Sequence, residues 1–234
     1  MNENLWTFVT RGEAIFHISR SNGHEVPLQL LGEHNGTDIH DRHSAFETLA
    51  GKTGNDQQYC WSHITSDARE LKEFYGKDGY RILRSVKRVF REAKAFKGHG
   101  TMDDMEKLYH TLTFLLDSDY DRLKCRKYVD NLLKRRREWL FRFVIDPDVE
   151  ATNNRAERTL RSSVMYRKTN GGTRSETGDR VYERLASISY TAKLGGSNIM
   201  TNGPDEIRKW MTRKRLKKIE GRQNRSAKTA GSAS

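Results

Sequence analysis

The sequence is poor in apolar residues and in cysteine, and both shortages exclude whole classes of protein. Only 35% of the 234 residues are apolar, whereas a typical globular domain has about 45–50%. No run of about 18 apolar residues occurs, so the sequence predicts no membrane-spanning helix, and its start lacks the pattern of a secretory signal. The two cysteines, Cys60 and Cys125, cannot provide a disulfide framework and fit a reducing cytoplasm.

Several motifs of common enzymes and metal sites are also missing. No phosphate loop of the form Gly-x-x-x-x-Gly-Lys-Ser/Thr occurs, which argues against nucleotide hydrolysis, and no spacing suggests a Ser-His-Asp triad. Cys60 and His63 have half the spacing of a zinc site, but no second pair of ligands follows. We therefore predict no zinc centre and interpret Cys60 as the end of a buried strand.

Positive charge, by contrast, is abundant. Lysine and arginine total 43 against 31 aspartate and glutamate, which gives a formal net charge of +12. Such an excess favours a polyanionic partner, because cations neutralise phosphates and release counterions. The run Lys134–Arg137 fits either a DNA contact or a solvated helix face.

The apolar spacing predicts an α/β pattern followed by helices. Leu5–Val9 and Ala14–Ile18 are β-rich runs that predict an antiparallel hairpin. A strand before Asp41 and another over 57–61 follow, with short helices over 27–31 and 45–49. From Ser66 the spacing predicts three helices, the third over about 120–143. Further helices are predicted from near Asn154, along the apolar positions Val181, Leu185, Ile188 and Ala192, and from Asn202 with Pro204 in the first turn.

We expect one domain that carries an insertion, divided into five segments. These are a partial sheet region over 1–65, a helical insertion over 66–145, core helices over 146–200, a basic helix over 201–220 and a disordered basic tail over 221–234.

Two acids stand out by their context. Asp41 follows a predicted strand, and Glu157 lies in the first turn of a predicted helix rich in arginine. Converging carboxylates bind Mg²⁺, and a pair of such ions can drive phosphodiester chemistry. Spacing alone equally fits a strand-ending turn at Asp41 and a capping box at Glu157. Asp38 is a rival for Asp41.

The segment that contains Glu157 carries a more specific signal. Asn153–Arg161 has the sequence Asn-Asn-Arg-Ala-Glu-Arg-Thr-Leu-Arg, and Arg167-Lys168 and Ser187–Gly195 follow it. Together these segments resemble the C-terminal catalytic block of insertion-sequence-66-type DDE transposases. Leu5–Val9, Gly36–Asp41 with Ala45-Phe46, and Cys60–His63 resemble that family's other landmarks in the same order.

This resemblance implies a ribonuclease-H-like fold that cuts and joins DNA with three metal-binding acids. It assigns the second acid to Asp41 and the third to Glu157, with Mg²⁺ or Mn²⁺ as cofactor. The family's first acid, in an Asp-Glu-Thr segment before the Leu5–Val9 strand, is not found here. The family also has Gly-Tyr after the second acid, where this chain has Arg42-His43. We therefore expect an N-terminally truncated or split ribonuclease-H-like core.

The resemblance also implies the partners. Transposon ends and target DNA would be held by a set of cations near Glu157, namely Arg155, Arg158, Arg161, Arg167 and Lys168. The alternative function is that of an inactive DNA-binding remnant that joins a homo-oligomer or a full-length transposase. Either form is expected in the cytoplasm, associated with the nucleoid and with no membrane partner.

Overall fold

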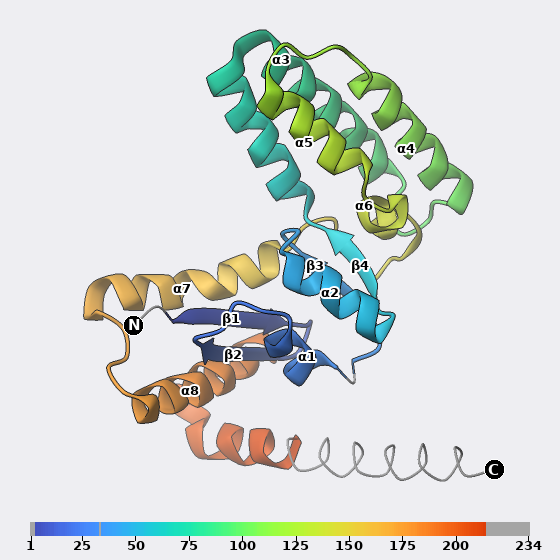
Figure 1. The fold of residues 1–234 in the computed structure, drawn as a ribbon. Coiled ribbons are helices and arrows are strands. Elements are labelled where there is room, and N and C mark those ends of the chain that lie inside the picture. The colour runs from blue at the N-terminus through green and yellow to red at the C-terminus, as the bar shows by residue number, and fades with distance from the viewer. Residues whose placement is uncertain (1–2, 33, 214–234) are drawn as a thin grey trace, which may run out of the picture. The chain divides into compact units, whose positions relative to one another are not determined.

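The computed structural model describes residues 3–32 and 34–213 and divides the chain into two compact units. The first unit combines residues 1–22 with 155–234, and the second spans 23–154. Both mix helices with a small two-stranded sheet (Figure 1). The α/β class is therefore confirmed, with more helix than strand. In the described ranges no helix has an apolar stretch of the length that a bilayer requires.

The first unit contains the predicted hairpin. Strand β1 (Asn4–Val9) pairs antiparallel with β2 (Ala14–Ser19), and Leu5 lies opposite Ile18. The turn closes with a hydrogen bond from the Thr10 N–H to the Glu13 carbonyl at 2.8 Å. The alternating apolar residues that predicted these strands place two of the larger side chains, Trp6 and Phe16, in the core.

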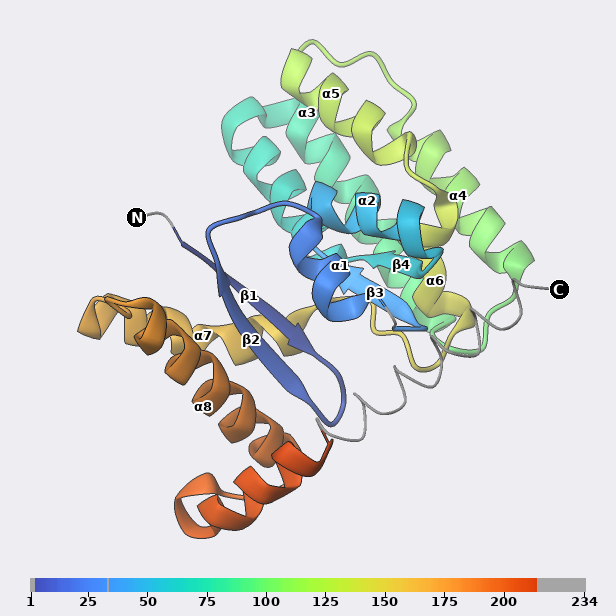
Figure 2. The same ribbon diagram turned by 60° about the horizontal axis from the view of Figure 1, so that its bottom comes forward.

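Helix α8 (Glu176–Leu194) covers the outer edge of β2 (Figure 2). Three of its side chains, spaced four residues apart, accept hydrogen bonds from alternate backbone N–H groups of the strand. These bonds join the Ile18 N–H to Glu183 Oε1 (2.6 Å), the Phe16 N–H to Ser187 Oγ (3.0 Å) and the Ala14 N–H to Thr191 Oγ1 (3.0 Å). The helical repeat thus matches the strand repeat, and donors that an edge strand would leave unpaired are satisfied.

Removing one of these acceptors should destabilise the protein. We expect Thr191→Val, which keeps the shape but leaves the buried Ala14 N–H without an acceptor, to lower the free energy of unfolding by about 1–3 kcal/mol. Urea denaturation measures this change. Thr169→Val is the control, because the exposed Thr169 hydroxyl only donates within its own helix and its loss should cost less than about 0.5 kcal/mol. Equal losses in the two variants would contradict the role assigned to Thr191.

Two expectations for this unit were wrong in detail. Ile188 and Ala192 are buried as predicted, but Val181 and Leu185 are each 51% exposed, because α8 turns its polar acceptors toward β2. The last helix begins at residue 199 rather than 202. Asn198 caps it by accepting a hydrogen bond from the Met200 N–H at 2.9 Å. The helix is described as far as residue 213, and the predicted tail over 221–234 lies outside the described residues.

A short parallel sheet begins the second unit. Strands β3 (Thr37–His40) and β4 (Asp56–Tyr59) pair in parallel, with His40 beside Tyr59. Helix α1 (Glu25–Leu31) precedes β3, and α2 (Ser44–Thr53) connects the two strands. The predicted end of α2 at Gly51 was wrong. The helix continues to Gly54, whose φ of 75° closes it in the left-handed conformation.

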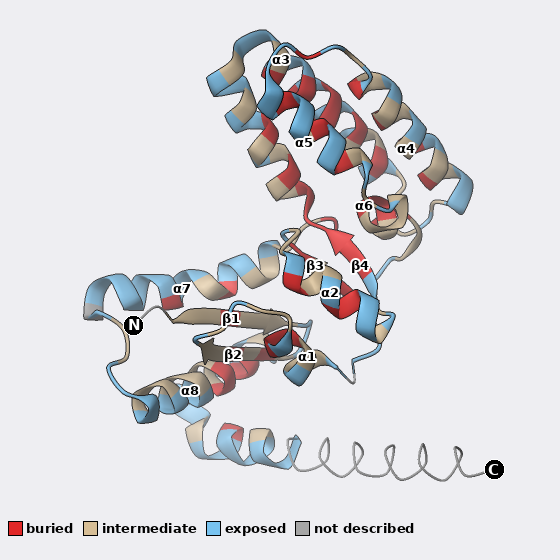
Figure 3. Ribbon diagram, in the orientation of Figure 1, coloured by how far each residue is buried: buried red, intermediate tan, exposed pale blue. Residues whose placement is uncertain are grey.

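A helical module follows the sheet in the same unit. Its helices are α3 (Trp61–Ala95), α4 (Met102–Leu116), α5 (Leu123–Leu133) and α6 (Arg137–Ile145). Their apolar stripes form one core, visible as the buried faces in Figure 3. Helix α3 starts at Trp61 rather than Ser66, so the predicted strand over 57–61 ends at Tyr59.

The third predicted helix is divided, and buried polar groups on β4 and α3 explain why. The carbonyl of Leu140 accepts hydrogen bonds from Trp61 Nε1 at 2.6 Å and Gln58 Nε2 at 3.0 Å. Gln58 Oε1 accepts the Phe143 N–H at 3.0 Å. These bonds replace part of the regular helical pattern, and Phe141 between them departs from helical geometry with φ of −127°.

Candidate functional site

Two of the landmark segments meet at the carboxyl end of the parallel sheet in the second unit. Strand β3 ends at His40 and β4 at Tyr59, so Asp41 and Cys60 directly follow neighbouring strands. The Cys60 N–H donates to the His40 carbonyl at 2.8 Å and ties the two chain segments together. The carboxyl ends of parallel strands are where open α/β sheets bind their ligands.

A third landmark is bonded to the same place. The Asn153 N–H donates to Cys60 Sγ at 3.3 Å, and the Ser62 hydroxyl donates to Asn154 Oδ1 at 3.3 Å. The Trp61 N–H donates to the carbonyl of Ala151 at 3.0 Å. The Asn-Asn segment therefore contacts the Cys-Trp-Ser-His segment, a function that sequence reasoning assigned to neither. Only the shared order of the landmarks hinted at it.

The structure distinguishes the two rival acids by exposure. Asp41 is exposed, and its Oδ1 accepts the His43 N–H at 3.3 Å. Asp38 is buried within β3 and accepts a hydrogen bond from Gln57 Nε2 at 3.2 Å. Burial raises the pKa of Asp38, which disfavours the charged form that a cation needs. Asp41 is the carboxylate available to a ligand at this edge.

The residue after Asp41 has an unusual backbone conformation. Arg42 has a φ of 70°, whereas all other described residues with positive φ are glycines. Side chains other than glycine pay a steric cost there. The Arg42 N–H donates to His40 Nδ1 at 3.2 Å, and its guanidinium pairs with Asp67. The left-handed turn is therefore kept at the position where the resembling family has glycine.

This geometry reverses the usual ranking of glycine and alanine. We expect Arg42→Gly to be more stable than Arg42→Ala by about 1 kcal/mol, because both lose the Asp67 contact but only glycine relieves the left-handed strain. At the exposed helical position Arg91, alanine should be the more stable by about 1 kcal/mol. Chemical denaturation of the four variants checks both rankings. An alanine preference at both positions would show that Arg42 is not strained.

His40 supports the turn as a neutral side chain. Burial lowers the pKa of His40 to about 4, so its Nδ1 can accept the Arg42 N–H at neutral pH. Its ring stacks on Phe46 with centroids 4.8 Å apart. Next to it, burial alone would raise the pKa of the Cys60 thiol, but hydrogen bonds from His63 and the Asn153 N–H outweigh burial and lower it.

Comparison with known proteins identifies the family to which these landmarks belong. A family model described as Transposase IS66 family matches residues 1–180, most of the chain. The chain belongs to the IS66 family of transposases. Comparisons with curated proteins and with solved structures found no match. Membership of a DDE transposase family implies a DNA partner and dependence on a divalent metal.

The third acid of this IS66-family chain lies in the first unit. Glu157 is exposed in the first turn of helix α7 (Asn154–Asn170). Four of the predicted DNA-contacting cations are exposed on α7, and Arg155 is half-buried. At about 100° per residue, Arg158, Arg161 and Lys168 share one side of the helix. Arg167 projects from another side, so the structure groups only part of the predicted set.

The basic run Lys134–Arg137 has partners within the transposase chain. Arg135 pairs with Glu47. The guanidinium of Arg136 lies 5.4 Å from the centre of the Trp139 ring. Arg137 binds Glu106 at 2.7 Å and also lies near Glu138. Most of this run therefore stabilises the helical module, and neither of the two sequence-based alternatives describes it fully.

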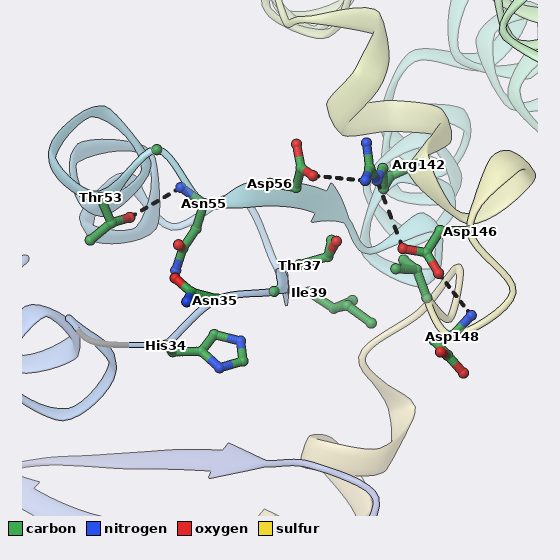
Figure 4. Close-up of a pocket in the computed structure, with 13 residues that line it drawn as sticks. His34, Asn35, Thr37, Ile39, Thr53, Asn55, Asp56, Arg142, Asp146 and Asp148 are labelled. Atoms are coloured by element: carbon green, nitrogen blue, oxygen red, sulfur yellow. Dashed lines mark hydrogen bonds and ion pairs between the residues drawn. The ribbon is translucent and has the colours of Figure 1, made fainter. Parts of the chain in front are cut away.

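A cavity of about 480 Å³ opens at the amino end of the same parallel sheet (Figure 4). Three of its acids could suggest a metal site, but they are already bonded. Asp56 pairs with Arg142 at 2.8 Å, and Asp146 accepts the Asp148 N–H at 2.9 Å. The cavity lies at the opposite end of the strands from Asp41. It is thus not the site that the IS66 landmarks define.

Proposed function

We propose that this chain contributes to a ribonuclease-H-like DDE transposase that cuts and joins DNA during movement of an insertion sequence. The family match carries this proposal, because the matched residues include both Asp41 and Glu157. The position of Asp41 at the carboxyl end of a parallel strand supports it. The catalytic chemistry is that of a phosphodiester bond attacked by a water or a 3′-hydroxyl.

Asp41 and Glu157 would hold Mg²⁺ or Mn²⁺. Both are exposed carboxylates, and hard oxygen ligands of this kind are the ones that these ions prefer. When bound, the metal supplies charge that activates the attacking oxygen and stabilises the leaving one. The cations of α7 would hold the DNA backbone and leave the reacting bond to the acids.

The alternative is a chain that binds DNA without cutting it and joins a complete transposase. The observation in its favour is that the resembling family needs a first acid, on a strand before Leu5–Val9, that none of the 234 residues supplies. Two carboxylates provide less charge and geometry than three. We therefore expect the chain by itself to bind DNA without strand transfer. Mg²⁺-dependent strand transfer by the purified chain, abolished by Glu157→Gln, would overturn this expectation.

DNA binding through α7 can be tested by its salt dependence. Each phosphate contact adds about 0.9 to the slope of log Kd against log salt concentration. We expect the triple variant R158Q/R161Q/K168Q to lower that slope by about 2–3, measured by fluorescence anisotropy with a labelled duplex. The control is K72Q/K107Q/K134Q, which removes the same charge from exposed lysines of the helical module. Binding that scarcely responds to salt in the unaltered chain would contradict the proposed function.

A further inference from the structure

Helix α3 carries a line of cations that the proposed function does not use. A kink at Tyr75-Gly76, with φ of 52° at the glycine, divides this helix into two segments. The segment before the kink mixes acids and bases. The segment after it, over 77–95, contains seven lysines and arginines against two acids. We call these seven residues the α3 stripe: Lys77, Arg81, Arg84, Lys87, Arg88, Arg91 and Lys94.

The α3 stripe occupies one side of the helix. At about 100° per residue, five members lie within an arc of roughly 80°: Lys77, Arg81, Arg84, Arg88 and Arg91. All seven are exposed. The opposite side holds the apolar residues that form the core of the module, among them Ile82, Val86 and Val89. At about 1.5 Å per residue the stripe is roughly 26 Å long.

Most of this charge has no partner within the protein. Across residues 3–32 and 34–213, the one carboxylate that forms an ion pair with a stripe cation is Glu92, which binds Arg88 at 2.9 Å. Lys94 lies over the Phe90 ring at 4.9 Å. The run Lys134–Arg137, in the same module, instead has mostly internal partners. Equal charge density thus has two different uses in the two segments.

The first turn of α4 makes the asymmetry sharper. Helix α4 packs against α3 and begins with Asp103 and Asp104. Positive charge is therefore concentrated on one outer side of the module, where self-repulsion among like charges costs stability unless an anion binds. A straight line of cations about 26 Å long matches a phosphate backbone that carries one charge per 3.4 Å on each strand.

We propose that the α3 stripe binds the phosphate backbone of duplex DNA, as a contact separate from the cations of α7. This inference rests on the proposed function for the choice of DNA. The helical insertion would thereby hold a length of duplex without reading its sequence, because arginine and lysine contacts to phosphate carry no base information.

Three variants with equal loss of charge test the stripe. R81Q/R84Q/R91Q alters the stripe, R158Q/R161Q/K168Q alters α7, and K72Q/K107Q/K134Q is the control. Anisotropy titrations with a labelled duplex of about 25 base pairs, at several salt concentrations, give the slope for each. We expect the stripe variant to lower the slope by about 2–3 and the control to change it by less than about 1. Circular dichroism confirms that each variant remains folded.

The outcomes separate the inference from the proposed function. A lower slope for the α7 variant but not for the stripe variant would overturn the stripe and leave the proposed function standing. Equal losses in the stripe variant and the control would show that only net charge matters and would also overturn it. No salt-dependent binding by the unaltered chain would overturn the proposed function. Tighter binding of an RNA duplex of the same sequence, lost in the stripe variant, would replace DNA as the ligand.

Discussion

Saturating Mg²⁺ or Mn²⁺ is expected to raise the Tm of the chain by about 5–10 °C. Metal at 100 times its Kd adds about 2.7 kcal/mol to the stability of the form that binds it, and 1 kcal/mol corresponds to about 2–4 °C for a protein of this size. Asp41→Asn or Glu157→Gln should remove most of this increase, because each deletes a charged oxygen ligand. Differential scanning fluorimetry with and without metal measures it.

Two controls make this prediction specific. Asp103→Asn removes an exposed carboxylate from α4 and should leave the metal-induced shift intact. Asp38→Asn tests the rival acid, whose buried side chain already accepts a hydrogen bond from Gln57. Its shift with metal should persist even where the basal Tm falls. A shift that survives Asp41→Asn but disappears in Asp38→Asn would transfer the second-acid role to Asp38.

Trp61→Ala is expected to cause the largest loss of stability. The side chain is fully buried, stacks on Phe90 with centroids 5.0 Å apart, and donates from Nε1 to the Leu140 carbonyl at 2.6 Å. Truncation of a buried tryptophan typically costs about 3–5 kcal/mol. The Tm should therefore fall by about 6–20 °C, as measured by circular dichroism.

Trp61→Phe separates packing from hydrogen bonding. Phenylalanine can keep much of the ring packing, but it leaves the Leu140 carbonyl with only the Gln58 bond. The expected cost is about 1–3 kcal/mol, clearly less than that of alanine. A Phe variant as unstable as the Ala variant would mean that the hydrogen bond, rather than the packing, holds the start of α3 in place.

Local patterns predicted those elements that local interactions form. The hairpin of β1 and β2 follows from two β-rich runs around a turn, and α8 ends at Gly195 as predicted. The division between α5 and α6 could not be predicted, because it depends on Gln58 and Trp61, which lie about 80 residues away. Long-range hydrogen bonds of this kind leave no periodic signal in a sequence.

The same distinction applies to Ser187 and Thr191. Their spacing resembled a family motif, but an apolar stripe beginning at Val181 was expected to form the buried face of the helix. The structure instead turns the hydroxyls toward β2, where they accept backbone N–H groups. An amphipathic pattern counts apolar residues and does not register polar groups buried because they are hydrogen-bonded.

At the candidate site, the position of Asp41 after a strand was predictable, whereas the turn that presents it was not. The left-handed conformation of Arg42 became visible only in the backbone. The contacts between Asn153 and Cys60, or Asn154 and Ser62, join segments about 90 residues apart. The sequence could place these landmarks in order but could not bring them into contact.

The most direct test of the proposed metal site is to map it with Fe²⁺ in place of Mg²⁺. With ascorbate and peroxide, bound Fe²⁺ generates radicals that cut the nearby backbone, and mass spectrometry locates the cuts. The proposed site predicts cuts next to both Asp41 and Glu157, which excess Mg²⁺ suppresses and Asp41→Asn removes. Cuts confined to the cavity that contains Asp56, Asp146 and Asp148, or cuts that Asp41→Asn leaves unchanged, would contradict it.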